Sequence, residues 1–127
     1  MKLYHVTTTN RAKSILKQGL IPGGINQDTE LDEIEREFAG AQFCADSADC
    51  ICLSNAEFID MRYGDVVLVV EVDPVQCVGF NGDVWEAGVE QCDLQDAEEI
   101  RFYGSIPADK IKVSRLFTSK RIQEMFS

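Results

Sequence analysis

VVLVVEV, residues 66–72, is the most strongly patterned segment of the chain. Its β-branched side chains favour an extended backbone, and apolar residues at almost every position are typical of a strand that is covered on both faces. Asp73-Pro74 follows directly, and proline ends such a strand because it has no N–H to donate to a sheet. We therefore predict a central buried strand, around which the rest of the chain packs.

The N-terminal residues predict a strand followed by a capped helix. Leu3, His5 and Thr7 alternate with Tyr4 and Val6, which is typical of a short strand with two different faces. The cluster at residues 7–10 offers N-cap oxygens, apolar residues then recur at helical spacing, and a glycine at 19 suits a left-handed C-cap. We expect a helix over residues 10–18.

The remaining elements are shorter. The sequence SNAE at 54–57 has the form of a capping box, which predicts a helix over 55–62. Residues 28–37 carry six acids, and the apolar residues among them recur at helical spacing, so we expect a solvated helix or a loop there. Residues 82–99 carry seven acids with little periodicity, so we expect an acidic loop. Further strands are expected at 50–53, 100–103 and 111–113, and a short capped helix near Ser119.

Length and composition indicate one α+β domain over residues 1–127. A chain of 127 residues with 45% hydrophobic and 27% charged residues is long enough to bury its own core. The net charge of -10 argues against general binding to phosphate backbones, which requires clustered Lys and Arg. No apolar run is long enough for a membrane span or a leader peptide, so we expect a cytoplasmic protein that does not bind membranes.

The cysteines and the histidine exclude most metal chemistry. Five cysteines without a C-x-x-C spacing, together with a single histidine, give little support for a zinc site or a disulfide framework. We expect reduced thiols and no bound metal. A cysteine nucleophile at Cys52 with His5 as its base has no support in the spacing, and nucleotide-binding glycine loops are absent from the sequence.

Three blocks of the sequence resemble the ADP-ribosyltransferase fold. The segment YHVT at 4–7, followed by A-x-x-I-L-x-x-G-L over 12–20, is similar to the opening strand and helix of that family. ICLS at 51–54, with YG at 63–64 before the valine strand, resembles the second motif. EEIRF at 98–102, leading to IPADKI at 106–111, is similar to the segment of that family that holds the catalytic glutamate and then a proline-marked turn. Similar sequences occur in the DNA-modifying toxin branch of the family.

The resemblance implies a single-domain fold with a split, mainly antiparallel β-core and short flanking helices. It also implies the use of NAD+ as co-substrate, with Glu99 as the catalytic residue. A carboxylate beside the ribose stabilises the oxocarbenium-like transition state and orients the incoming nucleophile. Glu99 is preferred to Glu98, which would point to the other face of the strand.

The same resemblance implies further contacts to NAD+. His5 and Thr7 would hydrogen-bond the ribose hydroxyls, and Arg11 would meet the pyrophosphate at the helix N-terminus. Ser54 would lie near the nicotinamide, although a helix cap also explains it. The chain departs from the tyrosine-bearing branch because Cys52 occupies the place of the stacking aromatic residue, so Tyr63, Phe43 and Trp85 become candidates for stacking.

The expected function is NAD+-dependent mono-ADP-ribosyl transfer to a protein or nucleic-acid target, in a toxin, an effector or a phage-encoded host modifier. An antitoxin partner is compatible with this expectation. The alternative is a catalytically inactive interaction or inhibitor protein on the same fold, in which the acidic segments 28–37 and 83–99 bind a basic protein partner. The RNA 2′-phosphotransferase branch also uses NAD+, but its basic RNA-binding portion has no counterpart in this acidic chain.

Overall fold

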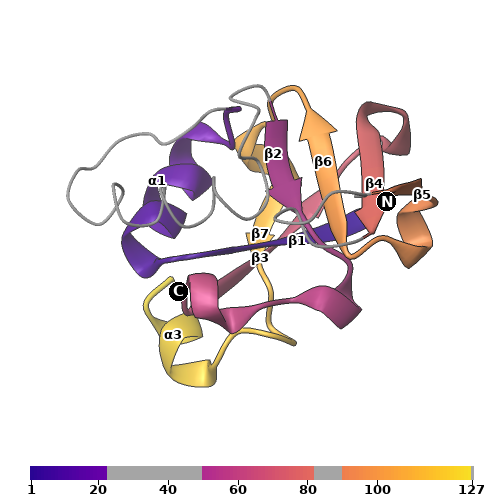
Figure 1. Ribbon diagram of the computed structural model, residues 1–127. Helices are drawn as coiled ribbons and strands as arrows, with labels where there is room; N and C mark the ends of the chain where they lie inside the picture. Colours follow the sequence, from indigo (N-terminus) through magenta and orange to yellow (C-terminus); the bar gives the residue numbers. More distant parts are fainter. Residues whose placement is uncertain (23–49, 82–89, 127) are drawn as a thin grey trace.

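Antiparallel strands dominate the computed structural model, which describes residues 1–22, 50–81 and 90–126 (Figure 1). Five short 3-10 turns connect the strands in these ranges. The strands are β1 (Lys2–Thr7), β2 (Cys50–Leu53), β3 (Val66–Glu71), β4 (Cys77–Asn81), β5 (Glu90–Cys92), β6 (Glu99–Tyr103) and β7 (Ile111–Val113), and the α-helices are α1 (Thr9–Gln18) and α3 (Lys120–Glu124).

The strands form two sheets. One has the order β1-β3-β7 and the other has the order β2-β6-β4-β5, and every pairing in both is antiparallel. Figure 1 shows β2 and β6 side by side in the second sheet, with β4 and β5 beyond them. The strand β3 occupies the centre of the first sheet, and four of its six residues are buried completely. The prediction from the valine-rich segment is therefore confirmed.

The hydrophobic core joins one face of each sheet. Leu3 of β1 and alternate residues of β3 share a cluster with alternate residues of β2 and β6, as the two-residue period of a strand requires. Helix α1 adds its buried positions Ala12 and Ile15 to this cluster. The members from the sheets are Leu3, Val66, Leu68, Val70 and Ile111 on one side and Ile51, Leu53, Ile100 and Phe102 on the other.

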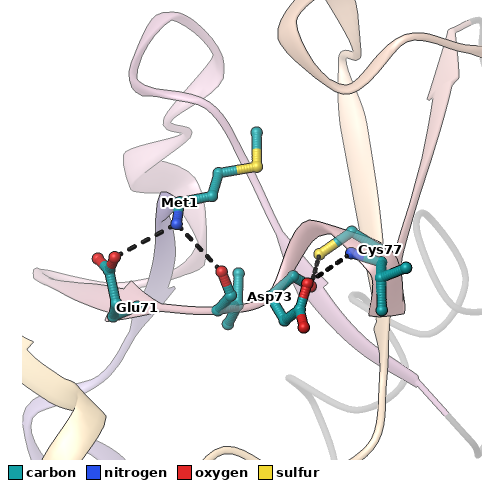
Figure 2. Close-up of polar contacts among 6 residues, drawn as sticks. Met1, Glu71, Asp73 and Cys77 are labelled. Atoms are coloured by element: carbon teal, nitrogen blue, oxygen red, sulfur yellow. Dashed lines mark hydrogen bonds and ion pairs between the residues drawn. The ribbon is translucent and has the colours of Figure 1, made fainter.

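A backbone bridge and a proline turn are two of the connections between the sheets. Tyr4 of β1 and Ser54, just after β2, exchange two backbone hydrogen bonds of 2.9 Å in an isolated antiparallel bridge. The chain also passes from β3 to β4 through a proline turn in which Asp73 caps the N–H of Val75. Figure 2 shows this turn beside the N-terminal ammonium group of Met1, which contacts Glu71 Oε1 at 3.3 Å and the Val72 carbonyl at 3.1 Å.

The predicted helix over 55–62 is wrong. Two 3-10 turns, Ala56–Phe58 and Met61–Tyr63, replace it, and the backbone between them is extended. Asn55, not Ser54, stands at the N-cap, and its side chain makes no capping bond. Phe58 and Met61 are exposed, so a helix here would have no apolar face to bury, and packing of such a face is the main source of helix stability.

The prediction of a loop over residues 82–99 is wrong at its end. Residues 90–92 form β5 against β4, and Leu94–Asp96 is a 3-10 turn. The strand β4 had no sequence prediction. Residues 82–89 and the acidic segment 28–37 lie outside the described residues.

The coarse fold prediction is confirmed, since the described residues form a small mixed α/β domain with two antiparallel sheets and few helices. Helix α1 begins within one residue of its predicted start, with Thr8 as N-cap, and α3 begins after the Ser119 cap. None of the helices in the described ranges is long and apolar enough to cross a membrane.

Candidate functional site

The imidazole of His5, on β1, contacts the backbone of β2. Its Nδ1 lies 2.9 Å from the backbone oxygen of Cys52. Burial lowers the pKa of His5 from 6.5 to about 4; the hydrogen bond to Cys52 opposes this shift, and the charge of Arg11 adds to it. The ring is therefore neutral at pH 7. Because a carbonyl can only accept, the proton is on Nδ1, and Nε2 remains as a hydrogen-bond acceptor.

Two buried polar atoms of β1 have no hydrogen-bond partner in the part of the chain that the structure describes. They are His5 Nε2 and Thr7 Oγ1, and their residues stand two positions apart on one face of the strand. Thr7 is only 1% exposed. A buried polar atom without a partner costs about 1–3 kcal/mol, and native proteins rarely leave one without a reason. A ligand with hydroxyl groups could satisfy both atoms.

Tyr63 is held against the end of β1 by the glycine that follows it. A Cβ atom at Gly64 would collide with the carbonyl of Thr7 and the amide nitrogen of Thr8, so only glycine permits this close approach. Burial raises the pKa of the Tyr63 phenol to about 12, and the negative charges of Asp60 and Glu99 act in the same direction. Tyr63 therefore lies within electrostatic reach of Glu99.

Two asparagines fix the chain just before Glu99. Asn55 Nδ2 donates to the carbonyls of Leu94 and Ala97 at 2.7 and 3.4 Å. Asn81 Oδ1 accepts the backbone N–H of Glu98 at 3.0 Å. These bonds, made from both sides of the segment, set the position at which β6 begins.

Glu99 forms a partly buried ion pair with Arg101. The Nε of Arg101 donates to Glu99 Oε1 at 2.9 Å, and the two side chains are 18% and 5% exposed. Burial raises the pKa of Glu99 above its usual value, against the hydrogen bond and charge of Arg101. The guanidinium of Arg101 also lies over the ring of Phe80, 4.6 Å from its centroid. Glu98, in contrast, is exposed.

The order of the strands brings the three sequence blocks together. β1 contacts β2 through the bridge at Ser54, and β2 pairs with β6. The pair Leu53–Ile100 ends that ladder, and the same register continued by one residue puts Ser54 opposite Glu99. Cys52, whose carbonyl contacts His5, pairs with Arg101. The first, second and third blocks thus lie on consecutive strands.

Arg11 and Ser54 are the other predicted site residues that the structure describes. Arg11 is half-buried and close enough for its charge to lower the pKa of His5. Ser54 is not a helix cap, because its backbone belongs to the bridge with Tyr4.

The cysteines differ in their bonding from the sequence prediction. Cys52 is disulfide-bonded, while Cys50, Cys77 and Cys92 form no disulfide. The prediction of reduced thiols is therefore wrong at Cys52, which also cannot act as a thiolate nucleophile in this state. The stacking candidates Phe43 and Trp85 lie outside the described residues.

Sequence reasoning missed the partner of Glu99. Opposite charges two residues apart on a strand share one face, so the spacing of Glu99 and Arg101 contained the signal. The contribution of Phe80 depends on its pairing with Glu99 across β4 and β6, which no local pattern predicts.

Comparisons with protein-family models, curated proteins and solved structures give no match to this chain.

Proposed function

We propose that this protein is an NAD+-dependent mono-ADP-ribosyltransferase with an ADP-ribosyltransferase-like fold, acting on a protein or nucleic-acid target. The observation that carries the proposal is a pair of buried polar atoms on β1, His5 Nε2 and Thr7 Oγ1, which have no hydrogen-bond partner among the described residues. A ribose offers two neighbouring hydroxyl groups, each of which can donate and accept. One hydroxyl donating to Nε2 and one bonded to Oγ1 would satisfy both atoms.

The remaining residues have roles that agree with this chemistry. In the reaction, the bond between the ribose C1′ and the nicotinamide nitrogen breaks, and nicotinamide leaves with the bonding electrons. A nucleophilic oxygen or nitrogen of the target bonds to C1′ and loses its proton. The Glu99 carboxylate would stabilise the positive charge that develops on the ribose and orient the nucleophile. In this proposal Tyr63 would contact nicotinamide, and Arg11 would meet the pyrophosphate.

Two buried threonines provide a matched test of ligand binding. The Thr7 hydroxyl has no partner within residues 1–22, 50–81 and 90–126, whereas the Thr118 hydroxyl donates to the Val67 carbonyl and accepts the Val67 N–H, both at 3.1 Å. Thr7→Val should leave the free energy of unfolding unchanged or raise it, because it removes an unsatisfied hydroxyl. The same variant should weaken NAD+ binding about tenfold, as expected for the loss of roughly 1.4 kcal/mol.

Thr118→Val should behave in the opposite way. It leaves the N–H of Val67 unpaired, whereas the Val67 carbonyl keeps its 2.8 Å bond from the Ser114 N–H. Unfolding should therefore become easier by about 1–3 kcal/mol, while the NAD+ dissociation constant of the folded protein stays the same. Calorimetry with NAD+ and urea unfolding measure both quantities. Equal NAD+ affinity in wild type and Thr7→Val would contradict the proposed ribose contact.

The catalytic role of Glu99 is tested by nicotinamide release, which needs no knowledge of the target because water can serve as the acceptor. Glu99→Gln should slow the release by at least about 100-fold and leave NAD+ affinity within a factor of two. Wild-type protein that binds no NAD+ at millimolar concentration would overturn the proposal and favour the acidic interaction protein instead.

A further inference from the structure

We propose that Arg101 is a positioning residue for Glu99, which holds one carboxylate oxygen and leaves the other for the reacting ribose. This inference rests on the proposed function. It begins from the ion pair, in which a single donor, Arg101 Nε, contacts Glu99 Oε1 at 2.9 Å. Among the described residues no second donor reaches this carboxylate, so Oε2 has no protein partner there.

The guanidinium is itself held in place. It stacks on Phe80 at 4.6 Å from the ring centroid, and Phe80 pairs with Glu99 across β4 and β6. Arg101 pairs on its other side with Cys52 of β2. A planar guanidinium fixed by an aromatic face and by a strand on each side loses little further freedom when it binds a carboxylate. The pair is therefore pre-organised, which is what orientation of a catalytic carboxylate requires.

The same contact supports the charge of Glu99. A carboxylate that is 5% exposed would favour its protonated form without a nearby cation. A protonated Glu99 could neither stabilise an oxocarbenium ion nor accept a proton from the nucleophile. Arg101 therefore acts on both the direction and the ionisation of Glu99, without touching the substrate.

Other titratable groups face this pair. Tyr63 comes from the 3-10 turn before β3, Cys50 from β2 and Tyr103 from β6 itself. Thiols and phenols ordinarily ionise above about pH 8, so they do not govern the acidic side of a pH profile. His5 on β1, with a pKa of about 4, titrates in the acidic range, and a measurement of Glu99 must be separable from it.

The experiment compares Arg101→Met with Arg101→Lys, which keeps the positive charge. Arg101→Met should lower kcat for nicotinamide release by at least tenfold with unchanged NAD+ affinity. The acidic limb of its pH profile should move upward by about one pH unit or more. Arg101→Lys should restore most of this shift. The control is Lys112→Met, which removes an exposed cation from β7 of the other sheet and should change neither quantity.

Carbon-13 NMR of the glutamate carboxyl carbons reports Glu99 directly, with Glu99→Gln to assign its signal. The Glu99 pKa should rise in Arg101→Met and return towards the wild-type value in Arg101→Lys. This readout does not depend on activity, so it separates the two proposals. A wild-type protein without NAD+ hydrolysis would contradict the proposed function, whereas an unchanged Glu99 titration in folded Arg101→Met would overturn the positioning role.

Discussion

His5 should couple the stability of this protein to pH. Its pKa falls from 6.5 to about 4 on folding, chiefly because burial disfavours the imidazolium ion. Between these two values the unfolded chain binds a proton that the native protein does not bind, so the free energy of unfolding falls as the pH falls. Each pH unit in this window changes stability by about 1.4 kcal/mol. The His5 contribution to this loss is therefore roughly 3 kcal/mol between pH 6.5 and pH 4.

The variant His5→Gln tests this magnitude, because glutamine can still donate to the Cys52 carbonyl but does not titrate. Urea unfolding of both proteins at several pH values gives two stability curves, and their difference cancels the carboxylates that titrate in the same range. The difference should be flat above pH 6.5 and should grow in favour of the variant as the pH falls towards 4.

The chain has a single histidine, so the imidazole proton signals report His5 without assignment. They should titrate with a pKa near 4, and the nitrogen shifts at pH 7 should indicate a proton on Nδ1. An imidazole pKa close to 6.5 in the native protein, or parallel stability curves for the two proteins, would refute the burial argument.

Two further predictions concern the segments that place Tyr63 and Glu99. Gly64→Ala should destabilise the protein by about 1–3 kcal/mol, since its Cβ would collide with the backbone at Thr7, and it should also weaken NAD+ binding. Urea unfolding measures the loss of stability, and calorimetry measures the loss of affinity. An alanine variant of wild-type stability would contradict the close contact. Asn55→Ala should cost about 1–2 kcal/mol, because it removes the amide hydrogen bonds to the carbonyls of Leu94 and Ala97. Asn10→Ala, at an exposed position of α1, is the control, and equal midpoints for both variants in urea would argue against this anchor.

The sequence determined those elements whose signals are local. The valine-rich segment 66–72 predicted β3 because its composition alone requires burial on both faces. Helix α1 followed from its threonine cap and the glycine at its end, which act within a few residues.

Local signals failed where distant residues compete for the same groups. The capping box at 54–57 predicted a helix, but the Ser54 backbone pairs with Tyr4 and the Asn55 side chain bonds to carbonyls about forty residues further along the chain. The strands β4 and β5 have weak patterns of their own, and pairing with β6 and with each other stabilises them.

Only the tertiary structure decided how the candidate site is assembled. Because β2 lies between β1 and β6, the Cys52 carbonyl contacts His5 of β1, and Cys52 pairs with Arg101 of β6. The close approach at Gly64 brings Tyr63 to the end of β1. Local propensity acts over a few residues, whereas these contacts join segments separated by about fifty residues, and their energy exists only once both sheets have formed. The sequence could therefore name His5, Thr7 and Glu99, but the fold determined their protonation and partners.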